Sequence, residues 1–337
     1  MNLRIGAALL CAALLPGQVR VAPGTGSLLP YDDRQATLIR VSERPIWYAR
    51  LADIAEVDEV DYASLPPARI PVPAPEGAAN PLIIHAWTFV PKVIDRGRKQ
   101  PLIVLPHGGV HGNFTLTYLH IVRELVEQGY SVIAPDYRGS TGYGMRFYEQ
   151  IDYGGRETDD VLAARNWMLD AYPFLDEKRV GLVGWSHGGM ISLMNVFGHP
   201  DAYAVVYAGV PVSDLVARLA YKPPTYAREF SVAYHIGKTV AENPQEYQRR
   251  SPVTHAAELR TPLLIHTNTI DEDVSVEEVK RLIRALTAAG KKFESKIYEA
   301  APGGHMFNRI DTRLARESRR EIWRFLAPYL QPERPAQ

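Results

Sequence analysis

A serine between glycines occupies the centre of the segment GWSHG, residues 184–188, which follows an apolar run and precedes the helix-like segment 188–198. A turn that leads this tightly from strand to helix forces its central residue into a strained backbone conformation, and side chains two positions away would collide. The following helix N-terminus favours developing negative charge. The pattern predicts Ser186 as a nucleophile, although G-x-S-x-G also occurs in ordinary turns.

A serine hydroxyl attacks well only when a base removes its proton. Where the serine lies in such a strand-to-helix turn, the order of the catalytic residues along the chain is serine, acid, histidine. Two histidines follow residue 260. His266 ends the apolar segment PLLIH, which suggests a structural role. His305 lies on the glycine-rich segment EAAPGGHMF after a predicted strand. We therefore predict His305 as the general base, with a surface-loop histidine as the alternative.

The acid that orients the histidine should follow the preceding strand. The segment NTIDEDV offers Asp271, Glu272 and Asp273. Spacing from the strand end favours Asp271, with Asp273 second. The same residues could instead be the solvated start of a helix.

The oxyanion of an acyl-transfer reaction needs two N–H donors. The residue after the nucleophile, His187, would supply one backbone N–H. The glycine-rich segment LPHGGVHG, residues 105–112, would supply the other, and we favour Gly109. A metal site using His107 and His111 is the alternative, but this pair lacks a third nearby ligand. We expect neither a metal nor an organic cofactor.

Short apolar segments alternate with amphipathic ones from residue 82 onwards, and this alternation predicts a parallel sheet covered on both faces. In such sheets, sites form beyond the carboxyl ends of the strands. A looser, tyrosine-rich stretch, about residues 211–258, would form a small cap. The expected strands are residues 82–90, 101–109, 130–136, 179–185, 202–209, 261–268 and 292–299, and the expected helices are residues 113–129, 157–172, 188–198, 275–290 and 319–330.

The N-terminal part differs in composition. Residues 1–22 are a candidate signal peptide, because Arg4 is followed by an apolar run, residues 5–15, that is too short to span a bilayer. A buried helix and a misassigned start are the alternatives. Cleavage would place the protein outside the cytoplasm, secreted or periplasmic, and would remove Cys11, the single cysteine; otherwise it would be cytoplasmic. Residues 23–81 are proline-rich, and we expect an extension that wraps the domain of residues 82–330.

The amino-acid composition limits the classes of molecule that the protein is expected to bind. The chain has 337 residues, 46% of them hydrophobic, which is enough for a large core. Lys plus Arg and Asp plus Glu number 38 each, so no net field favours nucleic acid or an anionic membrane. A small-molecule or short peptide substrate is therefore expected, and nothing in the sequence specifies an oligomeric state.

Five segments together resemble the catalytic domain of the prolyl oligopeptidase family, which includes dipeptidyl and acylaminoacyl peptidases. The resemblance covers about residues 82–330 and implies an α/β-hydrolase fold, with a mostly parallel doubly wound sheet and a small helical cap. It implies Ser186, Asp271 and His305 as the catalytic triad, and places Asp273 where relatives can hold a substrate-contacting residue. The segments are residues 105–112, 134–144, 184–189, 243–274 and 302–307.

Some features depart from the family or stay open. Members usually carry a β-propeller, whereas about eighty residues without a repeat precede this domain. Tyr143 and Trp185 are candidates for substrate contact. Arg138 would staple its loop by hydrogen bonds or touch substrate, and the tyrosines of 221–247 would line a pocket or fill the cap.

These features favour a serine peptidase that acts on short peptides or aminoacyl amides through an acyl-enzyme. A carboxylesterase with the same triad is the first alternative. A non-catalytic hydrolase-fold protein that binds a ligand is the second.

Overall fold

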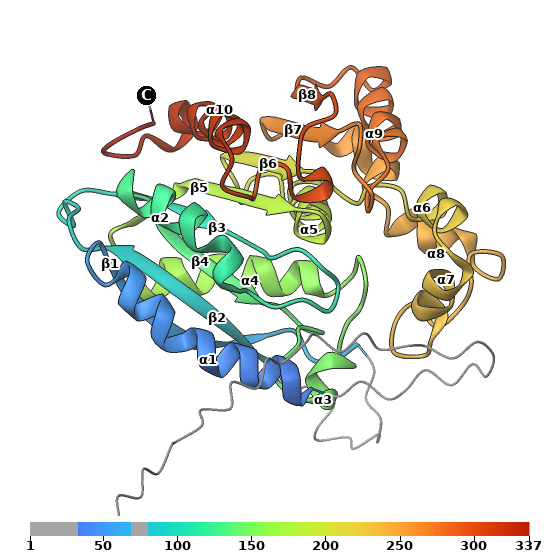
Figure 1. Cartoon of the computed structure of the whole chain (residues 1–337), viewed down its shortest axis with the longest axis horizontal. Coiled ribbons are helices and arrows are strands. Elements are labelled where there is room, and N and C mark those ends of the chain that lie inside the picture. Colours follow the sequence, from blue (N-terminus) through green and yellow to red (C-terminus); the bar gives the residue numbers. More distant parts are fainter. Residues whose placement is uncertain (1–32, 69–79, 337) are drawn as a thin grey trace, which may run out of the picture. The chain divides into compact units, whose positions relative to one another are not determined.

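A mixed sheet forms the centre of the computed structural model, which describes residues 33–68 and 80–336 (Figure 1). Within these residues the strands follow the spatial order β1-β2-β4-β3-β5-β6-β7-β8. The pairs β1/β2 and β2/β4 are antiparallel, and all other neighbours are parallel. The bounds are β1 Ala55–Ser64, β2 Leu82–Pro91, β3 Gln100–Val104, β4 Ser131–Asp136, β5 Leu175–Trp185, β6 Val205–Gly209, β7 Leu263–Asn268 and β8 Glu294–Tyr298.

Helices pack on both faces of this sheet. One apolar cluster includes side chains of α4, α5 and α9, and a second includes side chains of α1, α2 and α10. The sheet between two apolar layers confirms the predicted doubly wound α/β-hydrolase fold. The bounds are α1 Arg34–Leu51, α2 Leu119–Glu127, α3 Met145–Tyr148, α4 Glu157–Ala171, α5 His187–Gly198, α6 Leu215–Tyr221, α7 Pro224–Ser231, α8 Pro244–Arg249, α9 Val276–Ala288, α10 Arg313–Leu330, and the short 3-10 helices η1 Leu116–Tyr118, η2 Pro252–Glu258 and η3 Gly304–Met306.

Most of the inner strands are buried along their whole length. Every residue of β3, β4, β6 and β7 is buried, as expected for parallel strands covered on both faces. His266 belongs to this core, because its ring is 1% exposed and lies edge-on to Tyr207 and Tyr298.

The N-terminal segment differs from the expected wrapping extension. Residues 34–64 form a long helix and an edge strand of the same sheet, in which β1 pairs with all ten residues of β2. Trp47 anchors α1, since its ring is 1% exposed and stacks on Phe114 at 5.3 Å. The helical pattern was obscured in the sequence because Pro45 lies inside α1 and several large apolar residues of that helix are exposed. The candidate signal peptide, residues 1–22, and Cys11 lie outside the described residues.

Helix α2 begins later than predicted. The helix was expected from residue 113, and it starts at Leu119 after η1. The backbone N–H of Phe114 donates to the Asp136 carboxylate at 2.6 Å, which ties the preceding residues to the end of β4 as a loop.

The segment between β6 and β7 contains α6, α7, α8 and η2, where a cap was expected. In Figure 1, α6, α7 and α8 group together beside the sheet, away from α1 and α10. These three helices are called the cap below.

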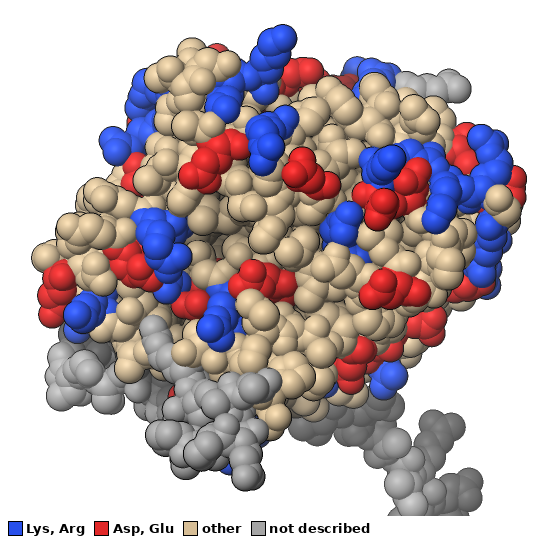
Figure 2. All heavy atoms as spheres, turned by 180° about the vertical axis from the view of Figure 1, so that it is seen from behind, with Lys and Arg blue, Asp and Glu red and all other residues tan. Residues whose placement is uncertain are grey.

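On the surface, acidic and basic side chains are mixed, as the balanced composition leads one to expect. On the face shown in Figure 2, the basic and acidic side chains of described residues are interspersed. Among the described helices, none is both long and apolar enough to cross a membrane.

Candidate active site

Ser186 lies in a strained turn at the end of β5. Its backbone has φ 58° and ψ −122°, a left-handed conformation that side-chain-bearing residues rarely adopt. A Cβ on Gly184 would overlap the carbonyl oxygen of Gly188, and a Cβ on Gly188 would overlap that of Pro106. The two glycines are therefore required by backbone contacts, as the sequence pattern predicted.

Hydrogen bonds hold this turn in place. The Ser186 N–H donates to the Gly209 carbonyl at 2.9 Å, which ties the turn to the neighbouring strand β6. The Ser186 carbonyl accepts from Met190 N at 3.0 Å, in the first turn of α5, and from Val212 N at 3.2 Å. The serine side chain is consequently held at the N-terminus of α5 by backbone geometry alone.

Asp271 and His305 meet although they follow different strands. His305 Nδ1 lies 2.8 Å and 2.9 Å from the two carboxylate oxygens of Asp271. The Asp271 side chain is fully buried, and its Oδ1 also accepts the backbone N–H groups of Asp273 (2.8 Å) and Val274 (2.7 Å). An acid held in this way fixes the imidazole orientation and leaves Nε2 to face away from it.

The loop that carries His305 is tied on several sides. Gly303 and Gly304 have φ values of 98° and 52°, and a Cβ on Gly304 would overlap the Glu272 carboxylate. Glu272 accepts the backbone N–H of His305 at 2.9 Å, and Asn268 donates to the Gly304 carbonyl at 3.0 Å. Glu272, which the sequence offered as a candidate acid, therefore positions the loop and does not contact the imidazole.

Asp273 links this pair to the pocket that Ser186 lines. Its Oδ2 lies 3.6 Å from His305 Nε2, and it lines the same pocket as Ser186. The Nε2 edge of the imidazole is thus beside that pocket. Burial raises the pKa of Asp273, but the charges of Arg218 and Lys222 outweigh this and hold it below its usual value. Asp273 Oδ1 accepts from Arg218 Nη2 at 3.1 Å and from Lys222 Nζ at 2.5 Å.

The two proposed oxyanion donors also line this pocket. Gly109 has φ 80°, and its carbonyl accepts the hydroxyl of Tyr137 at 2.7 Å. His187 is the first residue of α5. Within the described residues, neither backbone N–H donates to a protein acceptor. His107 does not line this pocket, and its Nε2 contacts Ser140 Oγ at 2.9 Å.

The pocket has a volume of about 220 Å³ and contains residues that the sequence did not single out. The cap contributes four of its lining residues. No sequence motif indicated them, because they lie on two short helices outside the sheet: Arg218, Tyr226, Glu229 and Phe230. Of the cap tyrosines, Tyr226 lines the pocket, whereas Tyr247 is fully buried in the core. The full lining is Gly109, Val110, His111, Tyr153, Ser186, His187, Val212, Arg218, Tyr226, Glu229, Phe230 and Asp273.

Two residues predicted to contact substrate lie elsewhere. Trp185 is 0% exposed, and its ring packs edge-on against Tyr207 at 5.3 Å, because alternate residues of β5 point to opposite faces and this one enters the core. Tyr143 donates to Asp136 at 2.5 Å and stacks on His85 at 4.2 Å, and it does not line the pocket of Ser186. Both side chains are structural.

Arg138 staples its loop. The guanidinium is fully buried and binds Asp160 through Nε (2.8 Å) and Nη2 (2.7 Å), and Nη2 also donates to the Leu65 carbonyl at 2.9 Å. Of the two interpretations of Arg138, the geometry supports the loop staple.

Comparison with known proteins gives this arrangement a family. The model of the prolyl oligopeptidase family matches residues 117–333, well over half of the chain. The chain belongs to the prolyl oligopeptidase family. This is a family of serine hydrolases, and membership confirms the resemblance inferred from the motifs.

Individual relatives are consistent with that assignment. The uncharacterized peptidase YuxL of Bacillus subtilis is 29% identical over 230 residues, 68% of this chain and 34% of the relative. Dipeptidyl aminopeptidase BIII of Pseudoxanthomonas mexicana is 30% identical over 192 residues, 56% of this chain and 28% of the relative. The chain thus matches about a third of the length of these curated relatives.

Solved structures support the fold. An acylaminoacyl peptidase from Pyrococcus horikoshii aligns with a TM-score of 0.67 and 20% identity, over 86% of this chain and 44% of that chain. At this identity the likeness establishes the α/β-hydrolase fold.

Proposed function

We propose that this protein is a serine peptidase that hydrolyses short peptides or aminoacyl amides through an acyl-enzyme. Ser186 Oγ attacks the substrate carbonyl carbon while its proton passes to His305 Nε2. The N–H groups of Gly109 and His187 hold the oxyanion. The C–N bond then breaks, His305 returns the proton to the leaving amine, and water hydrolyses the ester on Ser186 by the same steps.

The observation that carries the proposal is the Asp271–His305 contact at Nδ1, together with the 3.6 Å separation of His305 Nε2 from Asp273, a residue that lines the pocket of Ser186. An acid in this position stabilises the imidazolium that forms when the serine proton is taken up. The strained turn supplies the second requirement, a serine aimed out of the sheet at a helix N-terminus.

The pocket supports the substrate class. Val212, Tyr226 and Phe230 supply an apolar wall for one side chain. Asp273 and Glu229 supply carboxylates that can receive a peptide's amino group. Two similar proteins are named dipeptidyl aminopeptidase and acylaminoacyl peptidase, and both names describe peptidases.

The decisive experiment compares amide and ester substrates on purified protein. Aminoacyl p-nitroanilides and p-nitrophenyl acyl esters are assayed in parallel, with kcat/KM as the readout. Because an amide leaving group requires protonation by His305 more than an ester does, a peptidase hydrolyses both, whereas a carboxylesterase is active only on esters. The second result would overturn the peptide substrate class and retain the triad.

A fluorophosphonate probe tests whether the serine reacts at all. The wild-type protein should be labelled, and Ser186→Ala should not be. Ser192→Ala is the matched control, because this buried serine donates to the Gly188 carbonyl one turn into α5 and should not affect labelling. An unlabelled wild-type protein would favour a non-catalytic, ligand-binding role.

A further inference from the structure

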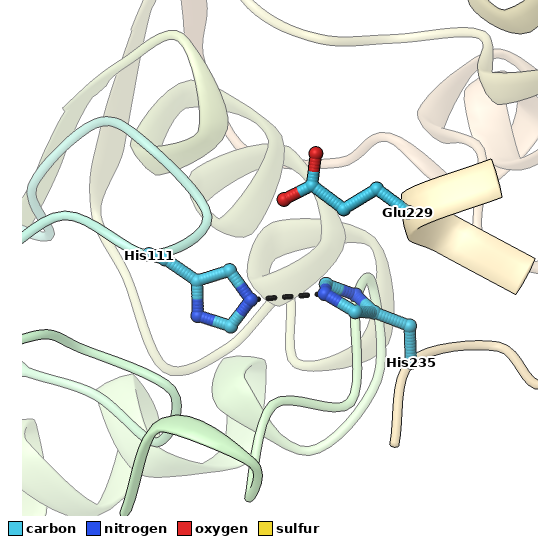
Figure 3. A group of neighbouring side chains, drawn as sticks. All are labelled: His111, Glu229 and His235. Carbon is cyan, nitrogen blue, oxygen red and sulfur yellow. Dashed lines mark hydrogen bonds between the residues drawn. The ribbon is translucent and has the colours of Figure 1, made fainter. Parts of the chain in front are cut away.

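Two histidines and a glutamate meet at the wall of the substrate pocket. His111 Nε2 lies 2.9 Å from His235 Nε2, and one Glu229 oxygen completes a group whose ligand atoms all lie within 4.8 Å of one another. Figure 3 shows the three side chains directed toward one another, His111 from the loop after β3, Glu229 from α7 and His235 from the segment after α7. Imidazole nitrogens with a carboxylate are a ligand set that zinc accepts.

The hydrogen bonding of His111 prepares it for a metal. His111 Nδ1 lies 2.7 Å from the Gly139 carbonyl oxygen, which can only accept, so Nδ1 carries the proton and Nε2 carries the lone pair. Histidines that bind metals in proteins are oriented in this way, with the second ring nitrogen donating to a carbonyl or carboxylate.

Neighbouring rings hold both imidazoles. His111 stacks on Tyr148 with centroids 3.6 Å apart, and the fully buried His235 lies edge-on to Phe230 at 5.2 Å. Tetrahedral zinc with bonds of about 2.0–2.1 Å places its ligand nitrogens about 3.3 Å apart. In the metal-free contact His235 Nε2 donates to His111 Nε2, so binding requires the His235 proton to move to Nδ1. Both rings must also turn so that their Nε2 lone pairs converge on the ion.

We propose that His111, Glu229 and His235 bind a zinc-like divalent cation whose remaining coordination position faces the substrate pocket. His111 and Glu229 line the same pocket as Ser186. The ion would join the loop that carries Gly109 to the cap, and it would occupy part of a pocket of only about 220 Å³. Zinc binding therefore stabilises the protein and inhibits hydrolysis reversibly; the second effect rests on the proposed function.

The sequence hid this site because its ligands are distant along the chain. His107 and His111 are near neighbours without a third ligand, whereas His235 lies 124 residues after His111. Folding of the cap against the loop after β3 supplies the two ligands that were missing.

Direct metal binding tests the site without reference to activity. Zinc chloride is titrated into the full-length, metal-free protein by calorimetry, and cobalt(II) chloride is used as an absorbing probe of tetrahedral coordination. Wild type should bind one ion. His235→Gln and Glu229→Gln should weaken binding more than about 100-fold, since loss of an outer-shell partner alone costs 10–100-fold.

A matched control separates this site from ordinary surface binding. His255 lies in η2, contacts Glu258 at 3.2 Å and is not part of the His111–Glu229–His235 group, so His255→Gln should bind zinc as the wild type does. Equal zinc affinity in wild type, His235→Gln and Glu229→Gln, or no binding to the wild type, would overturn the proposal.

Activity provides the second readout. Zinc should inhibit wild-type hydrolysis and raise its thermal midpoint, and the zinc concentration for half inhibition should rise more than about 100-fold in His235→Gln, relative to that variant's own zinc-free rate. Unchanged inhibition in His235→Gln would place the inhibitory ion elsewhere, for example at His305 and Asp273, and would overturn the inhibitory role. A protein that binds zinc through these residues but hydrolyses nothing would refute the proposed function and leave the metal site standing.

Discussion

The proposed catalytic residues and the cap residues are positioned by different physical means. Ser186, Asp271 and His305 each follow a parallel strand, β5, β7 and β8, so the sheet topology itself brings them to one edge. The cap residues Arg218 and Glu229 come from short helices outside the sheet. Their positions depend on side-chain contacts between segments far apart in sequence.

Ion pairs of a buried arginine contribute to holding the cap. Arg218 is 3% exposed and binds Asp273 at 3.1 Å, with Glu278 Oε2 at 3.7 Å from its Nη1. Glu278 in turn accepts the backbone N–H of Ser213 at 2.7 Å, where the chain enters the cap. Substitutions at the sheet edge that carries Ser186, Asp271 and His305 should therefore reduce the reaction rate or disturb backbone packing. Substitutions in the cap should destabilise the protein by breaking ion pairs.

The largest expected effect is at the acid. Asp271→Asn should lower kcat about 10⁴-fold, because the amide favours the wrong histidine tautomer. Asp273→Asn is the control, and we expect it to change KM more than kcat, since Asp273 contacts the other side of the ring. Steady-state kinetics on a p-nitroanilide checks this. A larger kcat loss in Asp273→Asn would transfer the acid's role to Asp273.

The next effect tests the cap. Arg218→Met should lower the free energy of unfolding by about 3–5 kcal/mol, because it leaves the buried Glu278 without its cation. Arg228→Met, at an exposed position of α7, should change it by less than about 0.5 kcal/mol. Urea unfolding followed by circular dichroism measures both. Equal stability of the two variants would mean that charge pairing does not hold the cap.

A third change tests the backbone fit of the serine turn. Gly184→Ala should destabilise the protein by about 3 kcal/mol, the upper range for overpacking, because the new Cβ meets the backbone of Gly188. Gly198→Ala is the matched control, since a Cβ there meets nothing within 4 Å, and it should be neutral or stabilise α5 by up to about 1 kcal/mol. Thermal unfolding distinguishes them; a Gly184→Ala protein as stable as wild type would contradict the steric account.

The smallest expected effect is a pH dependence of the core beneath the site. Burial lowers the pKa of His266 to about 3, against about 6.5 in the unfolded chain. The unfolded state therefore binds a proton that the folded state does not, and stability falls as pH decreases below 6.5. Between pH 6.5 and 5 this one group costs about 2 kcal/mol.

His266→Gln should remove that part of the loss. The comparison is the difference in unfolding free energy between pH 7.5 and pH 5 within each protein, so that altered packing, which counts equally at both pH values, cancels. An unchanged difference in the variant would show that the His266 ring is not kept neutral by burial.

Sequence patterns predicted the elements whose signals are local. The apolar runs of β3 to β7 were recognisable because a strand buried on both faces must be continuously apolar. The Ser186 turn was recognisable because only glycine fits two positions away. The pattern did not predict α1 and β1, because Pro45 and exposed apolar residues obscured the helical period of α1. It also did not predict the late start of α2, where the Phe114 N–H donates to Asp136 instead of entering a helix.

Local chemistry was therefore encoded in the sequence by itself: a strained serine turn, an acid and a histidine on successive strand-end loops, and a sheet to hold them. Spacing along the chain already favoured Asp271 as the acid beside His305. Tertiary structure alone decided that Trp185 enters the core and that His111 meets Glu229 and His235. The physical reason is the distance along the chain over which each kind of interaction acts. Backbone sterics and hydrophobic periodicity act over a few residues, whereas a side chain's partners depend on segments that only folding brings together.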